Sequence, residues 1–183
     1  MNWWGYSADQ MRWLAEDALN TDKNVIFVSH MGIDKETNYY NTNIRFGAEL
    51  RSIISAYQKG ESYSATLKDY WGNSVPVSAD FSSHGRILSY QFGHMHIEAS
   101  LYSEDIDLWQ ISTSSANVDQ TGVQTEEALM SGTANVKTLP WRVFTRKLGT
   151  ESEACFSVMS VSADRIYRYA VGVGNDELMI LPQ

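Results

Sequence analysis

The pattern of hydrophobic and polar positions changes along the chain, from helical to strand-like. Residues 7–19 begin with a serine and a glutamine at capping-box spacing and then repeat apolar side chains at helical spacing, which predicts a helix. The continuous apolar run at 25–28 predicts a strand buried on both faces, as in a sheet covered by helices. A polar stretch at 33–45 predicts a loop, and a second helical stripe at 46–59 ends before Gly60.

From residue 63 onward the hydrophobic pattern has a period of two, which indicates strands. The predicted strands cover residues 63–69, 75–79, 86–92, 97–102, 108–113, 142–148, 154–161 and 165–173. The Ser-, Thr-, Asn- and Gly-rich stretch 114–140 predicts a long loop, and loops of that length are usually functional or mobile. We therefore expect a single α/β domain, residues 1–183, in which a helix–strand–helix unit precedes mostly antiparallel strands.

The composition restricts the class of partner. Of 183 residues, 43% are hydrophobic and 20% are charged, which is typical of a globular protein. The net charge of -8 repels a phosphate backbone, so we expect no nucleic-acid partner. A small phosphate ester held by metal ions is still compatible with this charge, because the metal then sets the local field.

Cysteine usage and targeting signals favour the cytoplasm. Cys155 is the single cysteine, so no intrachain disulfide can form. The first residues lack the basic and apolar regions of a signal peptide, although a signal upstream of a fragment would be out of view. No apolar run reaches the roughly 20 residues that a membrane-spanning helix needs, so we expect no membrane partner.

Three of the four histidines follow predicted strands. His30 comes directly after the run at 25–28, and His94 and His96 lie just after a later strand. Side chains at strand ends point into the crevice where sheet proteins place their sites, and positions two apart face the same side. Neutral imidazole is the commonest metal ligand and suits Zn, Fe and Mn. A histidine after a strand is nevertheless more often a hydrogen-bonded core or surface residue, and this alternative applies most strongly to His84.

Several segments, taken in order, resemble the later motifs of the calcineurin-like metallophosphoesterases. A helix contains Gln-x-x-Trp-Leu at 10–14, a strand then ends in Ser-His at 29–30, and a later strand ends in Gly-His-Met-His at 93–96. The hairpin at 156–168 resembles the family's closing hairpin. The hairpin at 63–81 is similar to the one that precedes Gly-His-x-His in several bacterial members.

The resemblance implies part of a calcineurin-like phosphoesterase sandwich and part of its two-metal site. It assigns His30 and His94 to one metal and His96 to the other, with Mn, Fe, Zn or Mg as the divalent ion. In such sites a bridging hydroxide attacks phosphorus, so the implied substrate is a small phosphomonoester or phosphodiester.

The family's first three motifs have no counterpart in the sequence. Asp-x-His and Asn-His pairs are absent, so the chain corresponds to a C-terminal half, and no catalytic residue is assigned. Three histidines can hold one metal with a water, but they cannot bridge two metals. We therefore expect a metal-dependent phosphoesterase, or its C-terminal fragment that is inactive alone. The alternative is a non-catalytic module for oligomerisation or ligand binding.

Half of a two-sheet sandwich leaves an apolar face that must be buried. We expect a homodimer, another partner chain or a rearrangement of the fold to cover it. Trp3, Trp4 and Trp13 are candidates for that surface, and packing in the chain's own core is the alternative. A cupin-like barrel around the His-x-His pair fits less well, because its glutamate would have to be Glu98, which lies too close to the pair.

Overall fold

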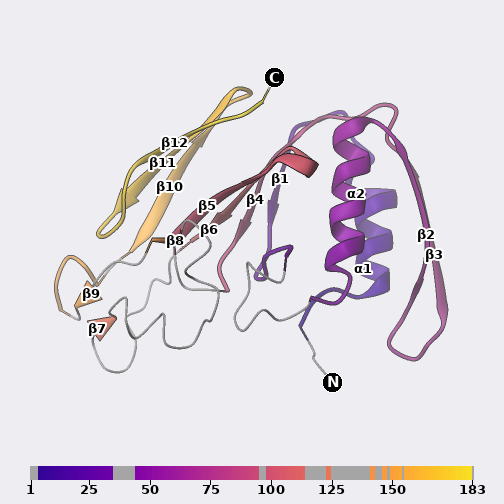
Figure 1. Ribbon diagram of the computed structural model, residues 1–183, viewed down its shortest axis with the longest axis horizontal. Helices are drawn as coiled ribbons and strands as arrows, with labels where there is room; N and C mark the ends of the chain where they lie inside the picture. The colour runs from indigo at the N-terminus through magenta and orange to yellow at the C-terminus, as the bar shows by residue number, and fades with distance from the viewer. Residues whose placement is uncertain are drawn as a thin grey trace.

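The computed structural model has a mixed α/β fold with few helices and several sheets (Figure 1). The residues that it describes are 4–34, 44–94, 98–113, 123–124, 141–142, 146–147, 149–153 and 155–182. Within these ranges, the helices are all too short or too polar to cross a membrane.

The two α-helices form where the sequence predicts them. They are α1 (Ala8–Trp13), which continues as a π-helical turn η1 (Leu14–Ala18), and α2 (Gly47–Lys59). A complete capping box starts α1: the Gln10 amide donates to Ser7 Oγ at 3.0 Å, and the Ser7 amide donates to Gln10 Oε1 at 2.8 Å. α2 begins one residue later than predicted, because Phe46 adopts a left-handed conformation (φ 60°), and it ends at Gly60 (φ 66°).

A five-stranded mixed sheet lies at the centre of the molecule. Its strands are, in spatial order, β1 (Val25–Val28), β4 (Ile87–Phe92), β6 (Leu108–Ser112), β5 (Glu98–Ser103) and β8 (Trp141–Arg142). A short 3-10 turn, η4 (Glu104–Ile106), follows β5. β4 runs parallel to β1 and β6, whereas β5 is antiparallel to β6 and β8. The carboxyl ends of β1 and β4 therefore meet at one end of the sheet, where α/β proteins place their sites.

The helices cover one face of this sheet, and a hairpin lies on the far side of the helices (Figure 1). The hairpin consists of β2 (Ser62–Lys68) and β3 (Ser74–Asp80), close to the predicted bounds. Side chains from sheet, helices and hairpin share one buried apolar cluster, which includes Tyr90, Ile87, Leu50, Met11 and Val77. Their removal from water is the main stabilising contribution on this side of the sheet.

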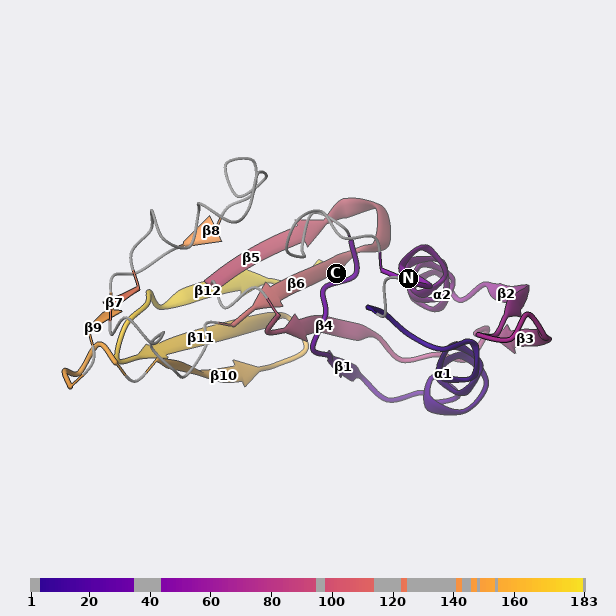
Figure 2. The same cartoon turned by 90° about the horizontal axis from the view of Figure 1, so that it is seen from below.

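A three-stranded antiparallel sheet packs on the opposite face (Figure 2). Its strands are β10 (Phe156–Val161), β11 (Arg165–Val171) and β12 (Glu177–Ile180). Leu88 and Ile111 of the central sheet meet Ile166 and Met179 of this sheet in a second apolar cluster. The sequence pattern does not predict β12.

A small two-stranded sheet lies in the described part of the chain between β6 and β10. β7 (Val123–Gln124) pairs with β9 (Arg146–Lys147), and β8 forms the margin of the central sheet. The predicted strand 142–148 is thus described only at its two ends. Most of the predicted loop 114–140 lies outside the described residues.

The prediction that residues 25–28 are buried on both faces is wrong. β1 is an edge strand in which Val25 and Phe27 pack against the helical core, whereas Ile26 is 41% and Val28 is 80% exposed. The second apolar cluster draws its central-sheet residues from β4 and β6, so the three-stranded sheet leaves this face of β1 open. An apolar run indicates a strand, but its place at the edge or centre depends on pairing that the local pattern does not encode.

Candidate metal site

The candidate site begins at the carboxyl ends of β1 and β4, where the backbones of the two following segments are joined. The Ser29 amide donates to the Gln91 carbonyl at 2.9 Å. Beyond the strands, the His30 carbonyl accepts from the amides of both Gly93 (3.3 Å) and His94 (2.9 Å). These backbone hydrogen bonds fix the segment that follows β1 against the segment that follows β4, although the two are more than sixty positions apart in the sequence.

The imidazoles of His30 and His94 converge in this region. His94 Nδ1 lies 3.1 Å from His30 Nε2, and the two rings meet edge to face at 80°, with centroids 5.0 Å apart. In the metal-free protein, one of the two nitrogens donates and the other accepts. His30 is exposed and His94 is half-buried, so the pair faces solvent on one side.

The spacing of these two nitrogens fits a shared metal ion. With metal–nitrogen bonds of about 2.05 Å, two ligands at a tetrahedral angle lie about 3.3 Å apart, and two at a right angle lie about 2.9 Å apart. The observed 3.1 Å falls between these values. The two nitrogens are therefore close enough to ligate one divalent ion, once the rings turn so that both lone pairs point at it.

The third predicted ligand, His96, lies outside the described residues, as does the neighbouring Met95. Among the residues that the structure describes, no group of three or more His, Cys, Asp or Glu side chains is arranged to hold a metal. His84 lies elsewhere: its Nδ1 contacts the Gly85 carbonyl at 2.7 Å, and its ring packs on Tyr57 with centroids 5.4 Å apart. This is the structural role that the sequence favours for His84.

Trp4 packs against His94 of this pair. Its ring centroid lies 5.2 Å from that of His94, and 48% of its surface is exposed. The segment is held by Arg45, whose amide donates to the Trp4 carbonyl at 3.2 Å and whose carbonyl accepts from Tyr6 at 3.1 Å. Gly5 is required between them, because a Cβ atom there would lie 2.5 Å from the Arg45 nitrogen, and its φ is 128°. Trp13 is also exposed, and Trp3 lies outside the described residues.

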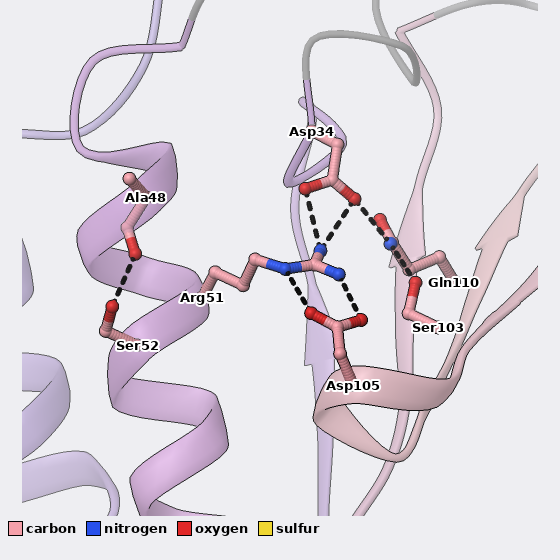
Figure 3. Close-up of polar contacts among 7 residues, drawn as sticks. All are labelled: Asp34, Ala48, Arg51, Ser52, Ser103, Asp105 and Gln110. Atoms are coloured by element: carbon pink, nitrogen blue, oxygen red, sulfur yellow. Dashed lines mark hydrogen bonds and ion pairs between the residues drawn. The ribbon is translucent and has the colours of Figure 1, made fainter.

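A charged cluster anchors the chain just after His30 (Figure 3). Arg51 of α2 donates to both oxygens of Asp34 at 2.7 and 2.9 Å, and it also holds both oxygens of Asp105. Gln110 of β6 donates to Asp34 at 2.9 Å and to Ser103 Oγ at 2.8 Å. The segment from His30 to Asp34 is thus fixed at its far end to the helix and to the sheet.

The charges in this cluster support one another. Partial burial opposes the positive charge of Arg51, but the hydrogen bond to Asp105 and the two carboxylate charges outweigh it, so its pKa is raised. The hydrogen bond from Arg51 holds the pKa of Asp105 below its ordinary value. Sequence reasoning missed this cluster, because Asp34 lies in a stretch read only as a polar loop. The sequence does contain one sign that Arg51 has a partner. Arg51 follows the buried Leu50, so it lies at the border of the apolar stripe of α2.

A hollow of about 200 Å³ lies beside His30, with Ser29, Gln91 and Thr113 among its lining residues. It gives a small ligand access to the histidine from the open side of β1. Its wall includes the side-chain amide of Gln91, which can donate a hydrogen bond to a phosphate oxygen.

Comparison with known proteins adds no family assignment: no protein-family model and no curated protein matches the chain. The relation to calcineurin-like metallophosphoesterases therefore stays a prediction from the order of motifs in the sequence. The site is defined by the converging nitrogens of His30 and His94 and by the cluster around Asp34.

Proposed function

We propose that this chain is the C-terminal part of a calcineurin-like phosphoesterase domain and that it binds a divalent ion, Mn, Fe, Zn or Mg, through His30 and His94. His96 is the expected ligand of a second ion. The observation that supports this proposal best is the 3.1 Å separation of two imidazole nitrogens at the carboxyl ends of adjacent parallel strands. In a complete site, the reaction is hydrolysis of a small phosphomonoester or phosphodiester.

In such a reaction, the residues of this chain would hold the ion and keep its ligands in place. A bound divalent ion supplies Lewis acidity toward a phosphate ester and lowers the pKa of water. His30 and His94 hold the ion, and the backbone bonds to the His30 carbonyl keep the two rings at ligating distance. Trp4 covers one side of His94 and limits the approach of water there. Nothing in the described part of the chain provides a carboxylate that bridges two ions, so we expect the chain alone to bind metal without hydrolysing the ester.

Metal binding is tested by elemental analysis and calorimetric titration of the purified chain with Zn and Mn. We expect about one bound ion per chain, because two imidazole nitrogens at this spacing can share one ion. His30→Ala and His94→Ala each remove one ligand and should reduce the affinity by at least about tenfold.

The matched control is His84→Gln, which removes a histidine outside the site. It should bind metal like the unaltered chain, since its ring packs on Tyr57 away from the His30–His94 pair. Equal metal binding by all four proteins, or none by any, contradicts the proposal. Hydrolysis of an aryl phosphate by the isolated chain would show that the site is more complete than we propose.

A second candidate function, self-assembly, is favoured by the outer face of the three-stranded sheet. Alternate residues of β10, β11 and β12 point away from the central sheet and leave large apolar side chains exposed: Phe156, Val158, Tyr169, Val171, Leu178 and Ile180. Contiguous apolar patches on this scale mark interaction surfaces. A second copy of this chain can bury the same face on both partners at once through a two-fold contact.

Light scattering coupled to size-exclusion chromatography tests this assembly. We expect a dimer that becomes monomeric in Val158→Lys, because a lysine ammonium buried within the contact loses its hydration. Ser83→Lys adds the same charge to an exposed loop and should leave the dimer intact. A monomer at every concentration contradicts this second function and leaves the metal proposal unaffected.

A further inference from the structure

A second hollow lies on the other side of β1, between that strand and α1. It has a volume of about 260 Å³. Met11, Leu14 and Leu50 form a buried apolar floor, and Trp13 and Val28 stand exposed at the rim. The aromatic rings of Tyr6 and Phe27 also line it. The hollow therefore combines apolar depth with ring surfaces and an opening to solvent, as small-molecule sites do.

A chain of hydroxyl groups runs along the wall of this hollow, and the direction of its hydrogen bonds follows from counting protons. The Tyr90 hydroxyl donates to the Met31 carbonyl at 2.8 Å, which uses its one hydrogen. Tyr90 must then accept from the Tyr6 hydroxyl, which uses the hydrogen of Tyr6. Tyr6 in turn accepts from Ser29 Oγ, 2.8 Å away.

The result is a row of hydroxyl oxygens that accept hydrogen bonds from a ligand, whereas the donor in the same lining is the side-chain amide of Gln10. The hydrogen of Ser29 is directed at Tyr6, so the lone pairs of Ser29 Oγ are what a ligand meets. Burial raises the pKa of the Tyr90 phenol well above its ordinary value, so Tyr90 keeps its proton throughout the physiological range. An ionised phosphate offers only acceptors and does not match this row of hydroxyl oxygens.

We propose that this hollow binds a compound with a single aromatic ring and a hydrogen-bond donor, such as an aryl alcohol, with the donor on Ser29 Oγ. The volume lies just below the usual range of ligand pockets, about 300–1,000 Å³, which limits the ligand to roughly one ring. Tyr6, Phe27 and Trp13 supply ring surfaces for stacking.

The position of the hollow connects it to the candidate metal site. Val28 and Ser29 line both this hollow and the one beside His30. Resting on the proposed function, the hollow is the place for the alcohol group released from a phosphate ester: the ester oxygen carries no hydrogen, whereas the released alcohol can donate to Ser29. Binding of the alcohol itself needs no metal.

The probes are phenol and anisole, which differ in that only phenol can donate a hydrogen bond. Each is titrated into the ¹⁵N-labelled chain without added metal, and the indole signal of Trp13, assigned from Trp13→Phe, reports binding. We expect both probes to shift this signal, with phenol binding about fivefold more tightly, the ratio that one net hydrogen bond provides. Ser29→Ala should weaken phenol about fivefold and leave anisole unchanged.

Ser83→Ala, an exposed serine in another loop, is the matched control and should leave both affinities unchanged. Equal affinity of the two probes for the unaltered chain, an unmoved Trp13 signal, or an unchanged phenol affinity in Ser29→Ala would each overturn the proposal. Repeating the titrations with His94→Ala separates the two proposals. Loss of metal binding there should not alter phenol binding, and failure of phenol binding says nothing against the metal site.

Discussion

Two arginines, each held between two carboxylates, connect different layers of the molecule under opposite degrees of burial. The side chain of Arg168 is fully buried, whereas that of Arg51 is 27% exposed. Both clusters carry two acidic groups for one guanidinium. The contribution of an ion pair to the free energy of unfolding therefore depends on how far water reaches each partner, and not on the geometry of the pair alone.

The Arg168 cluster joins the central sheet to the three-stranded sheet. Arg168 of β11 lies 3.0 Å from Glu98 of β5 and 2.7 Å from Glu177 of β12. Ser100 of β5 adds a donor to Glu177 at 2.6 Å. The side chain of Glu98 is 4% exposed and that of Glu177 is 19% exposed, so water has little access to replace the guanidinium if it is removed.

The largest effect is therefore expected from Arg168→Met, which keeps much of the apolar stem and removes the charge. Two carboxylates would be left buried together, and breaking a buried pair in this way costs about 3–5 kcal/mol in the free energy of unfolding. Urea denaturation monitored by circular dichroism measures it.

Arg165→Met is the control on the same strand, since Arg165 is exposed and pairs with its neighbour Asp164. It should change the free energy of unfolding by no more than about 1 kcal/mol. Similar losses in the two variants would mean that burial does not set the role of Arg168.

The burial of Arg168 shows how far sequence reasoning reaches. Residues 165–173 are correctly predicted as a strand, and the period of two places Arg168 on the same face as the buried Ile166. The pattern therefore contains the signal that an arginine points into the interior. It does not contain the partners, because Glu98 comes from a strand about seventy positions earlier.

The same limit applies to the rest of the fold and to the site. The two helices and most strands follow from local period, from the Ser7–Gln10 cap and from Gly60. The edge position of β1 and the four-residue β12 depend on non-local pairing, so local pattern misses them. Of the predicted ligands, the structure brings His30 and His94 together, His96 lies outside the described residues, and metal binding itself stays a prediction.

The Arg51 cluster should respond less to the loss of its arginine. In Arg51→Met, Asp105 can turn into water, because its side chain is already 64% exposed. Asp34 keeps the hydrogen bond from Gln110. We expect a loss of about 1–2 kcal/mol in the free energy of unfolding, the low end for a charge-assisted hydrogen bond, because water reaches Asp105. Urea denaturation measures it, and a loss as large as that of Arg168→Met would erase the distinction between the clusters.

The same variant should also loosen the segment after His30, because Arg51 joins that segment to α2 (Figure 3). Amide hydrogen exchange between His30 and Asp34 should become faster, whereas exchange in β11 should stay as it is. Unchanged exchange in the His30 segment would show that Gln110 is a sufficient anchor.

The smallest expected effect is the dependence on pH of the stability that the Arg51 cluster contributes. This dependence comes from protonation of Asp105 at low pH. The hydrogen bond and charge of Arg51 lower the pKa of Asp105 in the folded protein. Its contribution to stability is therefore present above the ordinary pKa of an aspartate, about 3.9, and is lost as pH falls through the lower, folded value.

Arg51 has a raised pKa and does not titrate in this range. The difference in unfolding free energy between the unaltered chain and Arg51→Met should be constant from pH 7 to pH 5 and should shrink by less than about 1 kcal/mol toward pH 3, because water screens the exposed Asp105. Urea denaturation of both proteins across this range measures it, and a difference that grows toward low pH would assign the acid sensitivity to another group.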